Sequence, residues 1–136
     1  MKSRLNRKIA GLTALLTVSA LILVGCGSEG SVTNLTAAEF SAKIQDTSIV
    51  VVDVRTPAEF AAGHIARAIN IDVDAATFES QVQKLDKSKT YAVYCHSGRR
   101  SGIATAAMAK DGFTSIYNLT SGFADWLANG MPSVTN

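Results

Sequence analysis

The chain has 136 residues, of which 47% are hydrophobic and 18% are charged, and its formal net charge is +2. Four of the 13 basic residues and none of the 11 acidic residues lie within residues 1–25, so residues 26–136 carry nine basic and eleven acidic side chains, a net charge of −2. This length makes one domain of ordinary size. We find no internal repeat and no basic stripe with interleaved aromatic residues, so nothing indicates a nucleic-acid partner.

Residues 1–25 have the pattern of a secretory signal peptide. A basic start with Lys2, Arg4, Arg7 and Lys8 precedes an uncharged and largely apolar run over residues 9–25. Two alternatives fit less well. An uncleaved transmembrane helix would be at the short limit for a hydrocarbon core of ~30 Å. Ordinary cleavage after Ala20 would leave an apolar stretch at the mature N-terminus.

The end of the apolar run, Leu23-Val24-Gly25-Cys26, resembles the lipobox of bacterial lipoproteins. In that family the cysteine is acylated and becomes the mature N-terminus. The resemblance implies a lipidated Cys26 that opens a flexible tether over residues 26–31. It also implies an extracytoplasmic protein, anchored by lipid to a bacterial cell membrane on its periplasmic or outer face. Cys95 would then be a free thiol in an exported protein, which rarely keeps one without using it.

Beyond the tether, strand patterns alternate with helix patterns, which indicates an α/β domain. Two capping boxes predict helix starts, Thr36 with Glu39 and Thr56 with Glu59, the second with a proline at the first helical position. Continuous apolar runs predict parallel strands that are buried on both faces. The predicted strands are 49–54, 91–94 and the weaker 115–119, and the further predicted helices are 74–85 and 103–110, the latter closed by Gly112.

The stretch Cys95-His96-Ser97-Gly98-Arg99-Arg100-Ser101 is the most informative motif, because it places a thiol between a strand and a helix. A loop there can turn several amides toward one point, and the helix adds its positive N-terminal end. Together with the two arginines, these features favour an exposed thiolate. Free cysteine titrates near ~8.5, whereas cysteines in such sites titrate at ~3.5–7.5. The alternative is a structural cysteine buried in the core.

Other polar residues have weaker claims to a role. Asp53 ends a predicted strand and should lie at the same sheet edge as Cys95, where it either shapes the site or caps backbone amides. Arg55 and Glu59 are four residues apart, and we expect them to form an ion pair. His64 suits a structural turn, and His96 should point outward. No cluster has the spacing of metal ligands, so we expect no metal.

Several motifs in order make the chain resemble a single-domain rhodanese, a sulfurtransferase. The match runs from about residue 32 to 132, and the domain is expected to span 32–136. The matching segments are Val51-Val52-Asp53-Val54-Arg55-Thr56-Pro57-Ala58-Glu59-Phe60, Gly63-His64-Ile65, Ala68-Ile69-Asn70-Ile71, the loop Cys95 to Arg100, Gly112-Phe113, Asn118-Leu119, Gly122-Phe123 and Trp126. One departure is Ala66-Arg67, which stands where the family usually has Pro-Gly, so we expect a locally different backbone there.

The resemblance implies a rhodanese-like α/β fold, with a central, mostly parallel sheet and helices on both faces. It also implies that Cys95 takes a sulfane sulfur from a small anionic donor such as thiosulfate, becomes a persulfide, and passes the sulfur to cyanide, a thiol or a protein, with no cofactor. Amides between His96 and Ser101 would stabilise the persulfide, and Arg99 and Arg100 would hold the donor's anionic oxygens. The expected substrate-binding residues are His96, Ser97, Gly98, Arg99, Arg100 and Ser101, with Asp53 and Arg55 in support.

Two other functions stay open. Phosphatases and arsenate reductases of the same fold are known for a loop that is one residue longer, with arginine six positions after the cysteine. Here that position is Ser101, and the arginines come four and five positions after Cys95. This spacing favours sulfur over phosphate or arsenate chemistry. A module that only senses sulfur or docks a partner would not need Cys95 for its cellular role.

Overall fold

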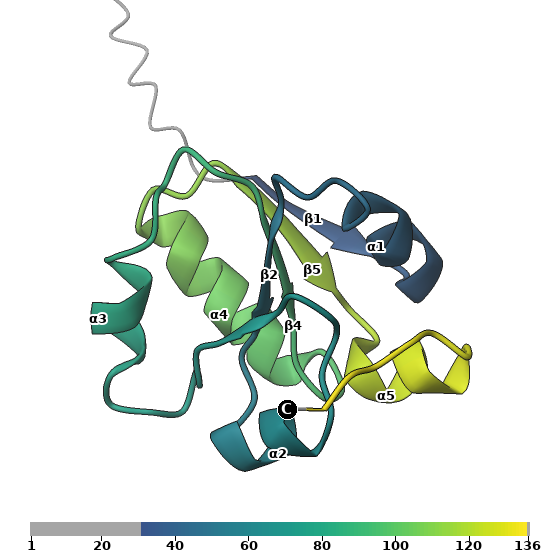
Figure 1. Cartoon of the computed structure of the whole chain (residues 1–136). Coiled ribbons are helices and arrows are strands. Elements are labelled where there is room, and N and C mark those ends of the chain that lie inside the picture. The colour runs from purple at the N-terminus through teal and green to yellow at the C-terminus, as the bar shows by residue number, and fades with distance from the viewer. Residues whose placement is uncertain (1–30, 136) are drawn as a thin grey trace, which may run out of the picture.

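The computed structural model describes residues 31–135, which form one sheet of five parallel strands with helices packed around it (Figure 1). The order of strands across the sheet is β1-β5-β4-β2-β3, and every neighbouring pair is parallel. This confirms the predicted fold class. The strands are β1 (Ser31–Leu35), β2 (Val50–Asp53), β3 (Ile69–Asn70), β4 (Tyr91–Tyr94) and β5 (Ser115–Leu119).

Helices cover both faces of the sheet, as expected. One face packs against α1 (Ala37–Lys43) and α5 (Gly122–Ala128), and the other packs against α3 (Phe78–Val82) and α4 (Arg99–Lys110). Helix α2 (Pro57–Ala62) lies at the carboxyl ends of the strands (Figure 1). The two faces make two separate cores, because successive side chains of a strand point to opposite sides. In β4, Ala92 and Tyr94 belong to one core, and Val93 belongs to the other.

The helix boundaries follow local chemistry. Both predicted capping boxes are present, with Thr36 and Thr56 each accepting from the amide of the glutamate three residues later. The prediction of a helix over 74–85 was wrong, because α3 has only five residues. The Asp72 carboxylate accepts from the Asp74 amide, a local turn that competes with helix formation.

Other elements also differ from the sequence predictions. Strand β2 covers 50–53 rather than 49–54, and α4 begins at Arg99 rather than 103, since the Gly102 amide already donates to the Gly98 carbonyl. Strands β1 and β3 were not predicted. Ser31, which we had placed in the tether, is the first residue of β1 and pairs with Ser115.

The departure from the family pattern, Ala66-Arg67, lies in the turn before β3. Arg67 has a φ of 67°, in the left-handed region that glycine adopts without strain. An L side chain pays roughly 1–2 kcal/mol there. The Arg67 guanidinium donates a hydrogen bond to the Ile44 carbonyl at the end of α1, which ties this turn to the helix and offsets part of that strain.

Within residues 31–135, no helix combines the length and the apolar character that crossing a membrane requires. The predicted signal peptide over residues 1–25 and Cys26, on which the lipoprotein prediction depends, lie outside the described residues.

Candidate active site

Cys95 and Asp53 lie together at the carboxyl edge of the sheet, where the sequence placed them. Asp53 ends β2 and is paired in register with Tyr94, the last residue of β4, and Cys95 comes next. Residues 95–98 form a short loop between β4 and α4. In parallel sheets, ligands collect beyond this edge.

The loop directs its carbonyl groups away from the sulfur. The Cys95 and His96 carbonyls accept from the amides of Phe123 (2.8 Å) and Ala124 (3.0 Å) in the first turn of α5. The Gly98 carbonyl accepts from the Gly102 amide at 3.0 Å, inside α4. With these carbonyls satisfied elsewhere, the Gly98 amide donates to Cys95 Sγ at 3.0 Å.

Two glycines allow this close approach between the loop and the start of α5. Gly98 has a φ of 95°, and a Cβ there would lie 1.9 Å from the Thr120 carbonyl oxygen. Gly122 has a φ of 75°, and a Cβ there would lie 2.4 Å from the His96 carbonyl oxygen. Since both atoms in the way are backbone, neither contact can be relieved by turning a side chain. Glycine is therefore required at both positions.

Opposing effects act on the Cys95 thiol. Burial raises its pKa and is the largest single influence, but hydrogen bonds to the sulfur together outweigh it, so the net pKa is lowered. In order of size, these bonds come from the Ser101 hydroxyl and from the amides of Ser101, Ser97 and Gly98. The Ser101 hydroxyl also lies 3.1 Å from the Gly98 carbonyl oxygen, and its one hydrogen serves a single acceptor at a time.

The expectation that the thiolate is exposed was wrong, because Cys95 is only 1% exposed and packs in the core on the α4 side. The Gly98 amide nevertheless donates to its sulfur at 3.0 Å, and hydrogen bonding lowers the pKa of the thiol, which a cysteine in a purely apolar core would not show. His96 and Ser97 are the exposed residues of the loop, as expected for His96, and Gly98 is half-buried. Hydrogen bonds to the sulfur, rather than exposure to solvent, therefore lower the pKa of this thiol.

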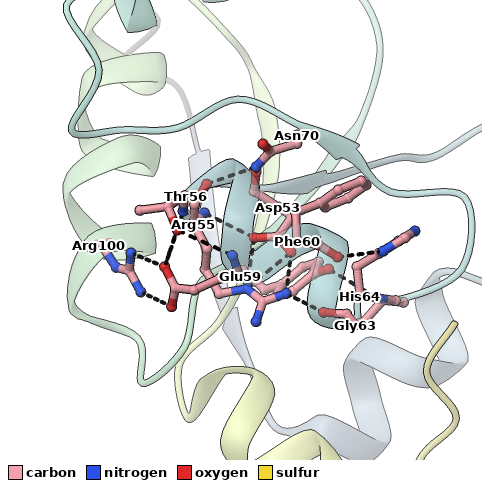
Figure 2. A network of polar contacts seen from close by, with 11 residues as sticks. Asp53, Arg55, Thr56, Glu59, Phe60, Gly63, His64, Asn70 and Arg100 are labelled. Atoms are coloured by element: carbon pink, nitrogen blue, oxygen red, sulfur yellow. Dashed lines mark hydrogen bonds and ion pairs between the residues drawn. The ribbon is translucent and has the colours of Figure 1, made fainter. Parts of the chain in front are cut away.

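Glu59 pairs with Arg100, which corrects the expected ion pair between Glu59 and Arg55. Two parallel hydrogen bonds of 2.8 Å join the Arg100 guanidinium to the Glu59 carboxylate (Figure 2). This contact is the main reason why the pKa of Glu59 falls to about 2. Arg55 precedes Thr56, the N-cap of α2, so the helical spacing that brings residues i and i+4 together does not apply to it.

Arg55 instead pairs with Asp53, and both side chains are buried. The guanidinium donates to both carboxylate oxygens of Asp53, with a shortest distance of 2.6 Å, and to the Gly63 carbonyl at 2.7 Å (Figure 2). It also lies 4.3 Å from the centre of the Phe123 ring. The pair therefore links the end of β2 to the turn after α2 and to α5, the helix on which the thiol loop is docked.

Of the remaining predicted residues, His64 and Trp126 are buried and Arg99 is exposed. His64 is buried and stacks on Phe60 at 3.8 Å, with Nδ1 2.9 Å from the Phe60 carbonyl oxygen, which confirms a structural place for it. Trp126 packs in the core with Phe123. Arg99 is exposed at the start of α4. In residues 31–135, no three His, Cys, Asp or Glu side chains are grouped to hold a metal ion.

Sequence reasoning missed one part of the site, the first turn of α5. Gly122 had been noted only as part of a matching motif, yet the close approach at Gly122 and the amide of Phe123 hold the loop from behind. A glycine as the first residue of an apolar helix was the available signal. It gave no indication of which loop would dock there.

Gly122→Ala should damage both the fold and the thiol. We expect a loss of roughly 3 kcal/mol in the free energy of unfolding, from left-handed strain and the backbone clash, and a higher pKa for Cys95. Urea unfolding and the pH dependence of Cys95 alkylation measure the two effects. Gly130→Ala is the matched control, because Gly130 also has a positive φ of 71° but open space around its Cβ. It should cost about 1 kcal/mol, and equal losses in the two variants would contradict the docking argument.

Glu59→Gln should reveal the Glu59–Arg100 pair through the pH dependence of stability. Because the folded-state pKa of Glu59 is about 2, below its ordinary value of 4.5, the pair stabilises the fold above about pH 4.5, and the effect is lost as the pH falls toward 2. Glutamine also serves in a capping box, so the helix start is kept. Wild type should exceed the variant by about 1.5 kcal/mol at pH 7, allowing for solvent screening. Chemical unfolding at pH 7 and pH 2.5 measures the difference, and a constant gap would refute the assignment.

Comparison with known proteins agrees with this geometry. The family model described as the rhodanese-like domain matches residues 36–129. Over 104 residues, the chain is 31% identical to a sulfurtransferase of Allochromatium vinosum, covering 76% of this chain and 95% of that protein. It is 31% identical over 93 residues to the thiosulfate sulfurtransferase GlpE of Coxiella burnetii, covering 68% of this chain and 85% of that protein.

A solved structure gives the same result. The rhodanese-related protein of Thermoplasma volcanium has a TM-score of 0.68 and 31% sequence identity to this chain. The match covers 76% of this chain and 98% of the Thermoplasma chain. The sulfurtransferases among the relatives support a role in sulfur transfer. With the family model matching most of the described residues, the chain belongs to the rhodanese-like family.

Proposed function

We propose that the protein is a sulfurtransferase that carries a sulfane sulfur on Cys95 as a persulfide. The Cys95 thiolate attacks the outer sulfur of a donor, a new S–S bond forms, and the donor's own S–S bond breaks. With thiosulfate as donor, sulfite leaves with the electron pair. A nucleophilic acceptor then attacks the outer sulfur and restores the Cys95 thiolate, so cyanide would leave as thiocyanate.

The observation that carries this proposal is the set of donors around Cys95 Sγ. The Gly98 amide lies 3.0 Å from the sulfur, and bonds from Ser101 and Ser97 also favour the anion. Such fixed donors stabilise negative charge without having to reorganise during the reaction. The same donors would stabilise the terminal sulfur of a persulfide. We propose that the exposed His96 and Ser97 contact the donor molecule as it approaches.

Incubation with thiosulfate should make the intact protein heavier by one sulfur atom, and later addition of cyanide should remove that atom and release thiocyanate. The measurement is intact-protein mass spectrometry. Cys95→Ser should abolish the gain because it removes the nucleophile. Cys26→Ser, the matched control, should still gain the atom, since Cys26 is outside the domain.

Other outcomes would favour the alternatives. Turnover of an aryl phosphate or arsenate at Cys95 would indicate phosphatase or reductase chemistry. If Cys95→Ser left the cellular role intact, the protein would act as a sensing or docking module. Position 101 holds a buried serine, which has no charge to offer a phosphoryl group.

We further propose that the protein is an extracytoplasmic lipoprotein anchored through Cys26. Support comes from the basic and apolar pattern of residues 1–25 and from the sequence Leu23-Val24-Gly25-Cys26. Two or more acyl chains would make the attachment stable. Strand β1 starts at the opposite edge of the sheet from Cys95, since all the strands run in parallel. The active site would therefore lie on the side of the domain away from its anchored end.

Cys26→Ser should release the domain from membranes when it is expressed in bacteria. Membrane and soluble fractions, separated by ultracentrifugation and probed for the protein, measure the effect. We expect wild type in the membrane fraction and the variant largely outside it, because the single acylation site is gone. Ser28→Ala, a neighbouring change that leaves the cysteine in place, is the control. Unchanged membrane retention of Cys26→Ser would defeat the lipoprotein proposal.

A further inference from the structure

The charged groups around the thiol loop balance one another. Arg55 is neutralised by Asp53 within a buried pair, and Arg100 is neutralised by Glu59. Asp74, an exposed carboxylate, adds its field at Arg100. The site is therefore not a cationic pocket. The three guanidinium groups of Arg55, Arg99 and Arg100 are equal in number to the three carboxylates of Asp53, Glu59 and Asp74, although only Arg55 and Arg100 form ion pairs within residues 31–135.

Arg100 is a half-buried cation whose charge interacts with that of Cys95, and the Glu59 carboxylate binds both of its terminal guanidinium nitrogens. Both terminal nitrogens of the guanidinium donate to the carboxylate at 2.8 Å. This is the two-pronged geometry with which arginine recognises an oxyanion. A sulfonate oxygen pair of thiosulfate would have to displace Glu59 to use it.

Glu59 is itself held in place. Its Oε2 accepts from the Thr56 amide at 3.1 Å and from the Thr56 hydroxyl at 3.0 Å, within the capping box of α2 (Figure 2). The carboxylate thus serves a helix cap and an ion pair together, so moving it would disrupt both contacts. This anchoring makes Glu59 a fixed competitor for any anion that approaches Arg100.

Arg99 cannot replace Arg100. It is exposed, and within residues 31–135 no carboxylate pairs with it. Charge interactions in water at ordinary ionic strength are strongly screened. A dianion that approaches the Cys95 thiolate would therefore meet a like charge with little fixed positive charge to offset it.

We propose that Glu59 determines donor specificity by filling the fork of Arg100, which makes the site select alkyl persulfides over dianionic thiosulfate. The inference rests on the proposed function of Cys95. In this reaction, the Cys95 thiolate attacks the outer sulfur of R–S–SH and a Cys95–S bond forms. The donor's S–S bond breaks, and R–S⁻ leaves with the electron pair. The proton remains on the outer sulfur and then passes to water, leaving the Cys95 persulfide anion.

The test compares two donors on the full chain, thiosulfate and 2-hydroxyethyl persulfide, whose organic part is uncharged. The second-order rate constant for loading one sulfur atom is measured for each donor by intact mass. The ratio of the two constants within each protein cancels any change in the thiolate itself. Glu59→Gln should raise the ratio of thiosulfate to persulfide about tenfold, because it frees the fork of Arg100 while keeping a capping-box residue.

Glu39→Gln is the matched control. Glu39 occupies the same capping-box position in α1 but pairs with no arginine in the described part of the chain. Its substitution should leave the donor ratio unchanged. Asp74→Asn is a second variant at an exposed position, which does not threaten the fold, and it should shift the ratio in the same direction as Glu59→Gln by a smaller factor.

Salt dependence gives an independent readout, which a merely structural role of Glu59 would not move. Loading of wild type by thiosulfate should not slow as salt rises, since no net attraction is screened, whereas loading of Glu59→Gln should slow. An unchanged donor ratio in both Glu59→Gln and Asp74→Asn would overturn the inference and leave the proposed function standing. If neither donor loads Cys95 in wild type, the proposed function itself fails.

Discussion

The docking of the thiol loop on the first turn of α5 is the constraint on which the site depends. A tight loop can present its amides to one atom only if its carbonyls find partners elsewhere, because buried backbone groups must be paired. The amides of Phe123 and Ala124 supply those partners for Cys95 and His96. The sulfur then faces donors, even though the residue that carries it is 1% exposed.

This arrangement separates two ways of stabilising an anion. Water and mobile cations would stabilise a thiolate poorly here, since the sulfur is buried and burial by itself raises the pKa of the Cys95 thiol. Fixed hydrogen bonds work better in a buried site, because they are not screened and need no reorganisation. Arg55 and Arg100 therefore have a structural role. Arg55 and Arg100 join β2, α2, α4 and α5 around the loop through their carboxylate partners and the Phe123 ring.

Local patterns in the sequence predicted much of the fold, and contacts that are distant in sequence account for the rest. Strands β4 and β5 and both capping boxes depend on neighbouring residues and were predicted. Strand β3 has two residues and exists only through pairing with β2, so no pattern of its own could reveal it. The shared position of Cys95 and Asp53 at one edge of the sheet was predicted, because both follow or end predicted parallel strands. The partners of Arg55 and Arg100 were not predictable, because spacing by four residues indicates contact only within a helix.

The count of charged residues misled for a related reason. From the sequence, two adjacent arginines after a cysteine indicate a cationic site. The carboxylate that pairs with Arg100 cannot be seen in that pattern. Glu59 lies 41 residues before Arg100, and only the packing of α2 against the start of α4 brings them together. Once they are paired, the local field is close to neutral, and it sits in a domain whose residues from 26 onward carry a net charge of −2. Long-range attraction of anions is therefore weak, and under the proposed function recognition of a donor would depend on short hydrogen bonds at the sulfur itself.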